Sequence, residues 1–597
     1  MRALQSAEGY WLAEWRSLAV LVAYGTALVA CGHHPKSPVL SDICDQIETY
    51  AKPGGGLAHC PESDAQPQVT YDAWLLLRHC RPDSRAVRAA SLYLKETGPL
   101  PLSPSTLMQR WILEPSARAE IANHRPPRPA VRDLLAAHVT PRLVRAMSTH
   151  KALERGSGNK QFARLFSHLA TTCVWPSVRE KPYALSPPSI LGNGAALLAL
   201  QQRAGSDRPL SAGHEASAAH LVPYLERYLY PDGSTYYLLF APPLLEYLRA
   251  YGREEDAKRF VGAIERVGYR AGGYVRTTMV ATNVIETSLT VLAMLELGAE
   301  EDDPAIVRAC EFLHRARTPS RIWSWSWESS SGSFGHRDSD SDDSGAALMA
   351  LQRAKSPYAT AHRDEIVSEL FRFQHEGGGL LTMDPSVWLA SPLTPSNNSR
   401  AIQGLLGLGV SPEDPRIVRA CQWLLEQQKP DGSWFDFWIS GATYGTTLAL
   451  EALVAAGYRS PGDPEIERAL YLFVRTQNND GGWGFDWYGT RTRESNVEHT
   501  AMAVYGLCKF SRPSARPMNA IEGAMRFLLE QQNADGSWPS SYVCNYSGWE
   551  GYTSSHYASV FALRAIAAYL ELSKQHLLRA PQLVRNRRIQ SRKMTAT

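Results

Sequence analysis

The sequence lacks the cysteine spacing of a zinc site and the paired cysteines of a disulfide framework. Its nine cysteines stand singly, with no CxxC pair and no Cys/His spacing suited to zinc. We therefore expect reduced, mostly buried thiols in a cytosolic protein. A strong charge of either sign is also missing. A formal charge of +3 over 597 residues gives no electrostatic reason to expect a nucleic-acid partner.

Long hydrophobic runs are absent as well. The apolar run at residues 17–31 is too short to span a membrane. Its end resembles a lipoprotein cleavage site, but Glu8 and Glu14 precede the run where a signal peptide would have a basic start. We therefore expect a buried helix there. The basic tail from Arg585 to Lys593 is typical of a solvated end, with contact to anionic lipid headgroups as the alternative.

No stretch has the sustained period-two alternation of a sheet strand, and a helical repeat organises the chain instead. Asp-Pro pairs at Asp303, Asp414 and Asp463 each predict a helix start. Two of these helices, and a third beginning near Asn519, run into a Gln followed six residues later by a Trp across an Asp-Gly turn. These segments are Gln428 to Trp434, Gln477 to Trp483 and Gln532 to Trp538.

In each such segment the Asp-Gly pair supplies a tight turn, and the Gln can bond free backbone groups at a helix end. The segments therefore predict staples between neighbouring repeats, with weaker copies at residues 8–11 and 230–234. Apolar helices rich in small residues lie between them, at residues 287–298, 345–354, 446–457 and 500–508. Small side chains allow close helix packing around a common axis. We therefore predict an all-α fold built from two α/α barrels.

One loop stands apart because four aspartates lie within six residues, at positions 338, 340, 342 and 343. The plain interpretation is a solvated acidic loop that caps the following helix. A calcium loop is disfavoured because the required glycine and terminal glutamate are missing. If the loop points into a barrel, crowded carboxylates cannot all ionise, and one stays protonated as a general acid. His336 or Arg337 could then keep a neighbouring carboxylate ionised.

The segment Asp340-Ser-Asp342-Asp343 resembles the DxDD motif of class II terpene cyclases, and the Gln-to-Trp segments resemble that superfamily's QW repeats. The likeness to squalene-hopene cyclases covers most of the chain. It implies an isomerase-type cyclase in which Asp342 donates the initiating proton and Asp340 and Asp343 tune it. No cofactor is needed to begin that reaction. The resemblance also implies an active-site cavity between two domains: one barrel from residues 1–33 and 281–597 with the acid motif, and an inserted α-barrel from residues 34–280.

Aromatic rings would have a role in such a cavity. A carbocation is stabilised by ring faces at about 0.5 to 2 kcal/mol per desolvated contact, although core packing is the plainer role for any single ring. The candidate rings are Trp325, Trp327, Phe334, Phe435, Phe437, Trp438, Tyr444, Trp549 and Tyr552.

The chain departs from squalene cyclases beside the acid. Those enzymes carry an Asp-Val-Thr-Ala-His stretch whose His orients the acid, and the corresponding residues 396–402 have neither that Asp nor that His. Asn397 or Asn398 is then the candidate partner of Asp342, as asparagines are in class II diterpene cyclases. A cavity Trp of squalene cyclases is replaced by Ile285.

The substrate remains open between two classes. Residues 498–501, Glu-His-Thr-Ala, resemble the Glu-Glu-Thr-Ala stretch of bacterial cyclases that act on prenyl diphosphates. Arginines could hold such a head group, with exposed loop arginines as the plain alternative, and Mg²⁺ would be an optional cofactor. We therefore expect farnesyl or geranylgeranyl diphosphate ahead of squalene, cyclised into fused rings. The candidate diphosphate-binding residues are Arg276, Arg400, Arg491 and Arg493.

Other functions are less well supported. Residues 302–306 lack the final acid of a DDxxD motif, which disfavours metal-dependent ionisation of a diphosphate. A protein prenyltransferase β subunit, which needs zinc ligands, and a non-catalytic helical-repeat scaffold stay as alternatives. We expect no metal site, a small-molecule isoprenoid partner, and a monomer or homodimer. The protein is expected in the cytoplasm, with peripheral contact to the inner face of the membrane at most.

Overall fold

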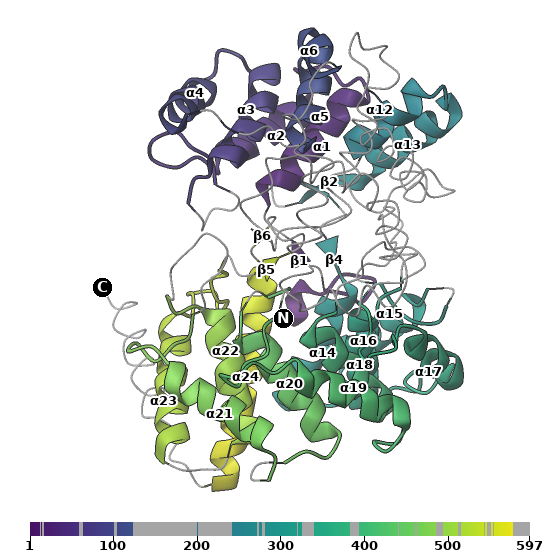
Figure 1. Ribbon diagram of the computed structural model, residues 1–597, viewed down its shortest axis with the longest axis vertical. Coiled ribbons are helices and arrows are strands. Elements are labelled where there is room, and N and C mark those ends of the chain that lie inside the picture. The colour runs from purple at the N-terminus through teal and green to yellow at the C-terminus, as the bar shows by residue number, and fades with distance from the viewer. Residues whose placement is uncertain are drawn as a thin grey trace, which may run out of the picture.

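The computed structural model is predominantly helical, with three short two-stranded ribbons among the described residues. Figure 1 shows a lower and an upper helical half. The described residues are 1–11, 13–14, 17–58, 64–98, 100, 104–122, 200, 241–271, 274–277, 281–318, 320–324, 339–382, 393–436, 438–439, 441–459, 462–484, 494–511, 515–541, 544–545, 551–552 and 554–576.

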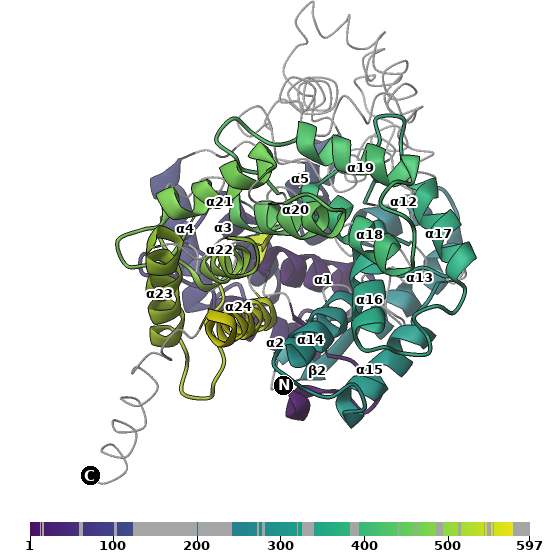
Figure 2. The ribbon, with the colours of Figure 1, turned by 90° about the horizontal axis from the view of Figure 1, so that it is seen from below.

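The lower half is a closed α/α barrel, hereafter the first barrel. Each inner helix packs against the next, and the last returns to the first (Figure 2). The inner helices are α14 (Val284–Glu296), α16 (Ser341–Arg353), α18 (Pro395–Gly407), α20 (Thr443–Ala455), α22 (Val497–Phe510) and α24 (Ser555–His576). The outer helices are α15 (Pro304–Arg315), α17 (Arg363–Arg372), α19 (Pro415–Glu426), α21 (Pro464–Thr476) and α23 (Ala515–Glu530). The predicted fold class is therefore confirmed for this half.

The two rings differ in how their helices are buried. Residues 284–294 of α14 and 443–453 of α20 are buried on all sides, because ring neighbours and outer helices enclose them. Outer helix α19 instead buries one face at helical spacing. Small residues do bring the inner helices together: a Cβ on Gly345 of α16 would lie 2.4 Å from the backbone carbon of Arg400 on α18. Only glycine fits at that crossing.

Gln428 and Gln477 each join two parts of the outer ring through the side-chain amide. Nε2 of Gln428 donates to the carbonyl of Gly432 in its own turn at 3.1 Å, and to that of Glu465 in α21 at 2.8 Å. Gln477 makes the equivalent bonds to its own turn and to α23. Gly432 has a φ of 90°, and a Cβ there would lie 2.5 Å from the carbonyl oxygen of Arg468. The turn therefore needs glycine for both its backbone angle and its close contact.

Each staple Trp ties the outer ring to the inner ring. Nε1 of Trp434 donates to the carbonyl of Leu424 in α19 at 2.6 Å, and its backbone N–H donates to Oγ1 of Thr446 in α20 at 2.9 Å. Trp483 and Trp538 also bond a preceding outer-helix carbonyl and an inner-helix hydroxyl group. The predicted role of these segments as staples is confirmed.

Two further staples belong to the series. Gln5 bonds its own turn and α15, and the backbone N–H of Trp11 donates to Oγ1 of Thr287, so the weak copy at residues 8–11 is a true staple. Gln374 bonds its turn and α19 in the same way although Leu380 stands in the place of the Trp. The copy at residues 230–234 lies outside the described residues.

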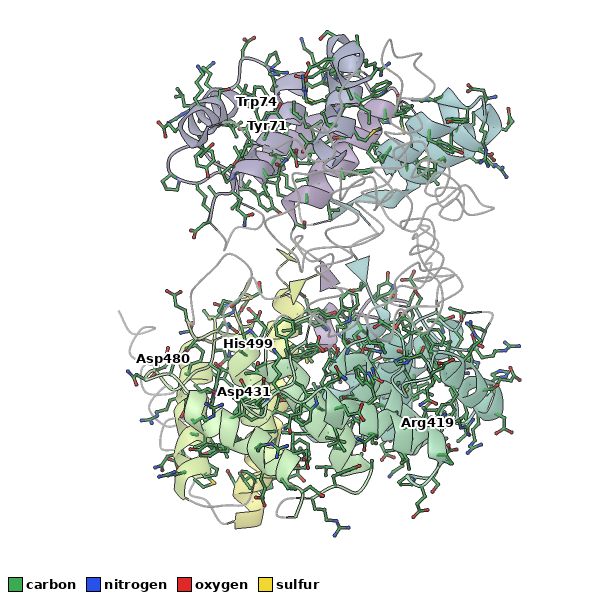
Figure 3. All side chains as sticks on the ribbon, viewed as in Figure 1. Tyr71, Trp74, Arg419, Asp431, Asp480 and His499 are labelled. Atoms are coloured by element: carbon green, nitrogen blue, oxygen red, sulfur yellow. The ribbon has the colours of Figure 1, made fainter. Side chains whose placement is uncertain are left out.

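The upper half, hereafter the second domain, has its own hydrophobic core, assembled around α1. On α3, Tyr71 and Trp74 pack with ring centroids 5.5 Å apart (Figure 3). The described elements are α1 (Leu18–Ala30), α2 (Pro38–Glu48), α3 (Pro67–Cys80), α4 (Arg85–Thr97), α5 (Pro104–Leu113), the 3-10 helix η2 (Pro115–Ala117), α6 (Arg118–Ala122), α12 (Ala241–Ala250) and α13 (Glu254–Val267).

The run at residues 17–31 is the buried helix α1, as expected. It packs in the core of the second domain, whereas Trp11 belongs to the core of the first barrel, beside the short 3-10 helix η1 (Arg2–Leu4). The predicted domain boundary at residue 33 would therefore place α1 in the first barrel, whereas its side chains pack in the core of the second domain. We propose that the chain passes from the first barrel to the second domain between Trp11 and Leu18. None of the described helices combines the length and hydropathy that crossing a bilayer requires.

The two connections between the halves run side by side. Strand β1 (Ala13–Glu14) pairs antiparallel with β4 (Ala281–Thr282), which leads into α14. Another ribbon, β5 (Cys544–Asn545) with β6 (Gly551–Tyr552), leads into α24, and β2 (Gly268–Ala271) pairs with β3 (Tyr274–Thr277). Because β4 and β6 lie between the halves, the N-terminal ends of α14 and α24 face the second domain (Figure 1).

Candidate active site

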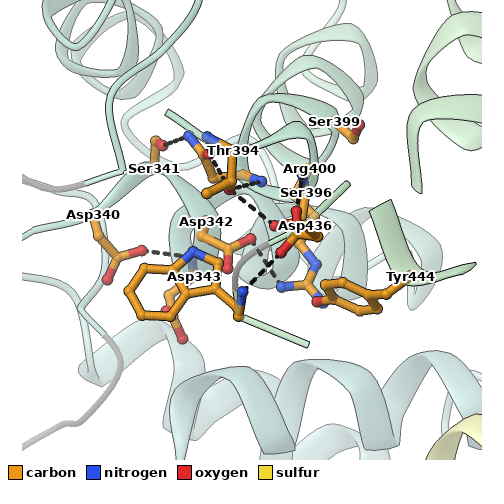
Figure 4. Close-up of polar contacts among 12 residues, drawn as sticks. Asp340, Ser341, Asp342, Asp343, Thr394, Ser396, Ser399, Arg400, Asp436 and Tyr444 are labelled. Carbon is orange, nitrogen blue, oxygen red and sulfur yellow. Dashed lines mark hydrogen bonds and ion pairs between the residues drawn. The ribbon is translucent and has the colours of Figure 1, made fainter. Parts of the chain in front are cut away.

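The DxDD segment forms the N-terminal end of α16 (Figure 4). Asp340 is the N-cap residue, and its Oδ1 accepts a hydrogen bond of 2.7 Å from the backbone N–H of Asp343. An aspartate at this position satisfies a free N–H group of the first turn and suits the positive end of the helix dipole. Asp342 and Asp343 therefore occupy the first turn at the barrel end that faces the second domain.

Asp340 and Asp343 are buried carboxyl groups that favour the neutral form. Oδ2 of Asp340 and Oδ1 of Asp343 have no hydrogen-bond partner among the described residues. Burial and the Asp342 charge raise the pKa of Asp340 well above its ordinary value of 3.8. Burial and the charges of both neighbours do the same to the pKa of Asp343. Both groups therefore tend to hold protons at neutral pH.

Asp342 differs from its neighbours because it faces a cation. Oδ1 of Asp342 lies 2.8 Å from Nη1 of Arg400 on α18, and the Arg400 side chain is 4% exposed while that of Asp342 is 14% exposed. Nη2 of Arg400 donates to the hydroxyl group of Tyr444, and the guanidinium lies 5.6 Å from that ring's centroid. Burial is the largest single effect on the pKa of Arg400 and lowers it, but Asp342, Tyr444 and Asp343 together outweigh burial, so the pKa is raised overall.

The asparagines that were expected to orient Asp342 point elsewhere. The Asn397 amide donates to Oγ of Ser341 at 3.2 Å and to the Leu380 carbonyl at 2.7 Å, and its oxygen caps α18. Asn398 bonds both backbone groups of Leu380. This corrects the expectation that one of them contacts the acid. Both amides instead form hydrogen bonds with the backbone of Leu380, which precedes α18 in the chain. Arg400 lies beside Asp342 in their place.

Asp436 is a site residue that the sequence did not reveal. It is fully buried, and its Oδ2 and Oδ1 accept hydrogen bonds of 3.0 Å from the backbone N–H groups of Ser396 and Trp438. Burial raises its pKa to about 6, and the Asp342 charge adds to the increase. Asp436 thus satisfies a free backbone N–H group in the first turn of α18. The contact spans 40 positions, so local spacing gave no signal for it.

Glu286, also missed from the sequence, is fully buried in the first turn of α14. Its Oε1 accepts hydrogen bonds from the hydroxyl groups of Thr282 and Tyr557. Burial raises its pKa to about 7, partly offset by these hydroxyl donors and by Arg400. One signal could have found it, because Glu286 is an isolated acid within an otherwise apolar helical stretch.

The Glu498-His499 stretch begins α22 at the same end of the barrel, and Figure 3 labels His499 in the lower half. Both side chains are buried. Oε1 of Glu498 accepts a hydrogen bond of 2.8 Å from the backbone N–H of Ser541, and Nδ1 of His499 faces Oγ1 of Thr443. Burial lowers the pKa of His499 to about 4, so its ring is neutral at neutral pH.

Of the candidate rings, the structure brings Tyr444 to the acid, where it also packs on Phe561 with centroids 5.9 Å apart. Phe435 instead lies beside the Lys429 ammonium, 4.7 Å from its ring centroid, and Trp438 packs against the core of the second domain. The side chains of the other candidate rings, and of three candidate diphosphate ligands, lie outside the described residues. These are Trp325, Trp327, Phe334, Phe437, Trp549, Tyr552, Arg276, Arg491 and Arg493.

The family of the first barrel is shown by its sequence. Residues 280–571 match the sequence model of the squalene-hopene cyclase C-terminal domain. This part of the chain therefore carries the C-terminal domain of squalene-hopene cyclases, which are class II terpene cyclases. The geometry fits that match, because the acid segment caps an inner helix of the matched barrel. A search of the described residues found no group of three or more His, Cys, Asp or Glu residues placed to hold a metal ion.

Curated relatives match only part of the chain. It is 28% identical over 197 residues to the squalene-hopene cyclase of Zymomonas mobilis, covering 31% of this chain and 29% of that protein. Sporulenol synthase of Bacillus subtilis is 26% identical, with 34% and 35% covered. The squalene-hopene cyclase of Schizosaccharomyces japonicus is 37% identical, with 31% and 29% covered. The matches thus span about a third of each relative's length.

Among solved structures, the chain is similar to ent-copalyl diphosphate synthase from Streptomyces platensis. The superposition covers 93% of this chain and 96% of that one, with 16% sequence identity and a TM-score of 0.49.

Proposed function

We propose that the protein is a protonation-initiated cyclase that converts a linear isoprenoid into a fused polycyclic product. The observation that carries this proposal is the Asp342–Arg400 pair within a cluster of buried carboxyl groups. An alkene is a very weak base, so the acid that protonates it needs a strongly stabilised conjugate base. Arg400 supplies this, because its hydrogen bond to Oδ1 of Asp342 strengthens as the proton leaves.

The neighbouring carboxyl groups supply the proton. Because Asp340, Asp343, Glu286 and Asp436 all have raised pKa values, the cluster retains protons at neutral pH. Interacting acids share protons, so the titration belongs to the cluster rather than to one residue. We propose that Asp342 delivers the proton, since its side chain is more exposed than those of Asp340 and Asp343. The reaction begins in this way without a cofactor.

We further propose that the substrate binds with its hydrocarbon end at the acid. Arg400, an expected diphosphate ligand beside the acid, is already paired with Asp342. A diphosphate head group therefore has to lie away from α16, and Mg²⁺ would accompany it. We propose farnesyl or geranylgeranyl diphosphate as the substrate, on the resemblance of residues 498–501 to bacterial cyclases that use such substrates.

Squalene is the second candidate, favoured by the match of residues 280–571 to the squalene-hopene cyclase domain. Squalene has no head group, so its cyclisation would not depend on added Mg²⁺. We propose that either substrate reaches a cytoplasmic enzyme that contacts membranes peripherally, because both are poorly soluble in water.

The test is to incubate the purified protein separately with farnesyl diphosphate, geranylgeranyl diphosphate and squalene, with and without Mg²⁺, and to analyse organic extracts by mass spectrometry. We expect a cyclic isomer of one substrate from the wild-type protein, and a loss of turnover by several orders of magnitude in Asp342→Asn. Failure to convert any of the three, or unchanged turnover in Asp342→Asn, would contradict the proposal and favour a scaffold.

A further inference from the structure

Glu286 lies beside the DxDD cluster without belonging to it, and its oxygens are unequally bonded. Oε1 accepts from the hydroxyl groups of Thr282 and Tyr557, the latter at 2.7 Å. Oε2 is buried and has no hydrogen-bond partner among the described residues. A buried carboxylate is costly unless its oxygens are satisfied or paired with a cation. The arrangement therefore suits a neutral carboxylic acid with its proton on Oε2.

The groups that act on Glu286 come from three other inner helices. Asp343 on α16 and Arg400 on α18 interact with it electrostatically: a charge on Glu286 raises the pKa of Asp343, and Arg400 lowers the pKa of Glu286. On α24, Tyr557 donates to the carboxyl group, and Nε2 of His556 lies 3.4 Å from the Glu286 carbonyl oxygen. Burial lowers the pKa of His556 to about 4, so that ring carries no charge at neutral pH.

A protonation-initiated reaction needs a way to restore the acid. Each turnover leaves the DxDD cluster one proton short. The final ring closes at the end of the carbon chain away from the protonated alkene, so the terminating proton is released at a distance from Asp342. A carboxyl group beside the acid is poorly placed to collect that proton. It is well placed to replace the one that Asp342 has lost.

We propose that Glu286 is the proton-return group of this active site, an inference that rests on the proposed cyclase function. After the substrate is protonated, the O–H bond of Glu286 breaks as an O–H bond forms on a carboxylate of the DxDD cluster. The resulting Glu286 carboxylate then takes a proton from solvent. One proton enters the cluster for each proton delivered to substrate, and no electrons are transferred.

The first experiment needs no substrate. Infrared difference spectra between the wild-type protein and Glu286→Gln at pH 7 report the C=O stretching band of a buried carboxylic acid. We expect a band in the wild type that is missing in Glu286→Gln, and that shifts in D₂O because its proton exchanges. If the two spectra are identical in this region, Glu286 holds no proton and the proposal is overturned.

The second experiment compares single-turnover with steady-state rates, using whichever of the three substrates the wild type cyclises. Glu286→Gln should keep a single-turnover rate within about twofold of wild type, while its steady-state rate falls about tenfold or more. The matched control is Glu451→Gln, a buried glutamate on α20 that pairs with Arg564 at 3.2 Å, outside the acid cluster. Glu451→Gln should leave the ratio of the two rates unchanged.

The outcomes separate this inference from the cyclase proposal. A parallel fall of both rates in Glu286→Gln, or no change in either, overturns the proton-return role while the cyclase function stands. A wild-type protein that converts no substrate overturns both. If Glu286→Gln does not fold, Tyr557→Phe removes the phenol donor alone, and the same selective loss of the steady-state rate is expected.

Discussion

Arg400 and Asp342 form an ion pair between α18 and α16, joined across 58 positions of sequence with 2.8 Å between Nη1 and Oδ1. The same guanidinium donates to the hydroxyl group of Tyr444 on α20, so the Arg400 side chain links α18 to two other inner helices. A buried ion pair tends to be structurally costly unless its hydrogen bonds are well made. The place of this pair among the buried carboxyl groups of the acid cluster therefore supports a catalytic role.

Arg400→Lys tests that role. Lysine keeps the charge but cannot bond Asp342 and Tyr444 at once, because it lacks the planar fork of guanidinium. We expect turnover to fall about a hundredfold, with little change in KM, in assays with the substrate that the wild type uses. Arg419→Lys is the matched control, since Arg419 on α19 bonds the staple residue Gln374 at an exposed position. Equal activity of Arg400→Lys and wild type would contradict the assignment.

Glu286 should make the protein less stable as the pH rises. Its folded-state pKa of about 7 lies above the ordinary 4.5, so its contribution to stability is fully present below pH 4.5 and is lost as the pH passes 7. In Glu286→Gln this loss should disappear. The free energy of unfolding, measured with urea, should therefore fall between pH 4.5 and pH 8 by about 3 kcal/mol more in the wild type than in Glu286→Gln. An identical pH dependence would show that Glu286 titrates normally.

Gly345→Ala tests the close crossing of α16 and α18. The added Cβ would press on the Arg400 backbone, so one helix has to shift. We expect a loss of about 1 to 3 kcal/mol in the free energy of unfolding, together with a loss of turnover as Arg400 moves relative to Asp342. Thermal unfolding and steady-state assays of the same preparation check both. Wild-type stability in Gly345→Ala would mean that the crossing is looser than described.

Gln428→Ala tests the staples. The substitution removes hydrogen bonds to Gly432 and Glu465 and leaves two carbonyls without that donor, so we expect a loss of about 1 to 3 kcal/mol in unfolding free energy. Turnover per folded molecule should be unchanged because the staple lies in the outer ring. Gln422→Ala is the control: Gln422 is exposed on α19 and bonds only Glu426 among the described residues. Equal losses in both variants would contradict a stapling role.

The repeat was predictable from the sequence because it is local. A Gln, an Asp-Gly turn and a Trp within seven consecutive residues are visible without any tertiary knowledge, and the structure confirms their contacts. The staple at Gln374 escaped notice because Leu380 replaces the Trp, although the backbone contacts are preserved. The Gln and its turn are therefore preserved in this repeat even though the Trp side chain is not.

The acid site was only partly predictable. The DxDD segment is contiguous, so its place at a helix start could be expected from Asp340 alone. The partner of Asp342 could not, because Asn398 and Arg400 lie on the same helix two positions apart and only the packing decides which one faces α16. Asp436 reaches Ser396 across 40 positions, a separation over which spacing carries no information. Charged groups paired through tertiary contacts are thus the part that the sequence conceals.

The N-terminal staple sets an order for assembly. Gln5 bonds the carbonyl of Ala305, and Trp11 bonds Thr287, so these two residues acquire their partners only after some 300 more have been joined. The inner ring likewise stays open until α24 meets α14. During synthesis on the ribosome, the second domain can therefore mature while the barrel is still an unclosed arc.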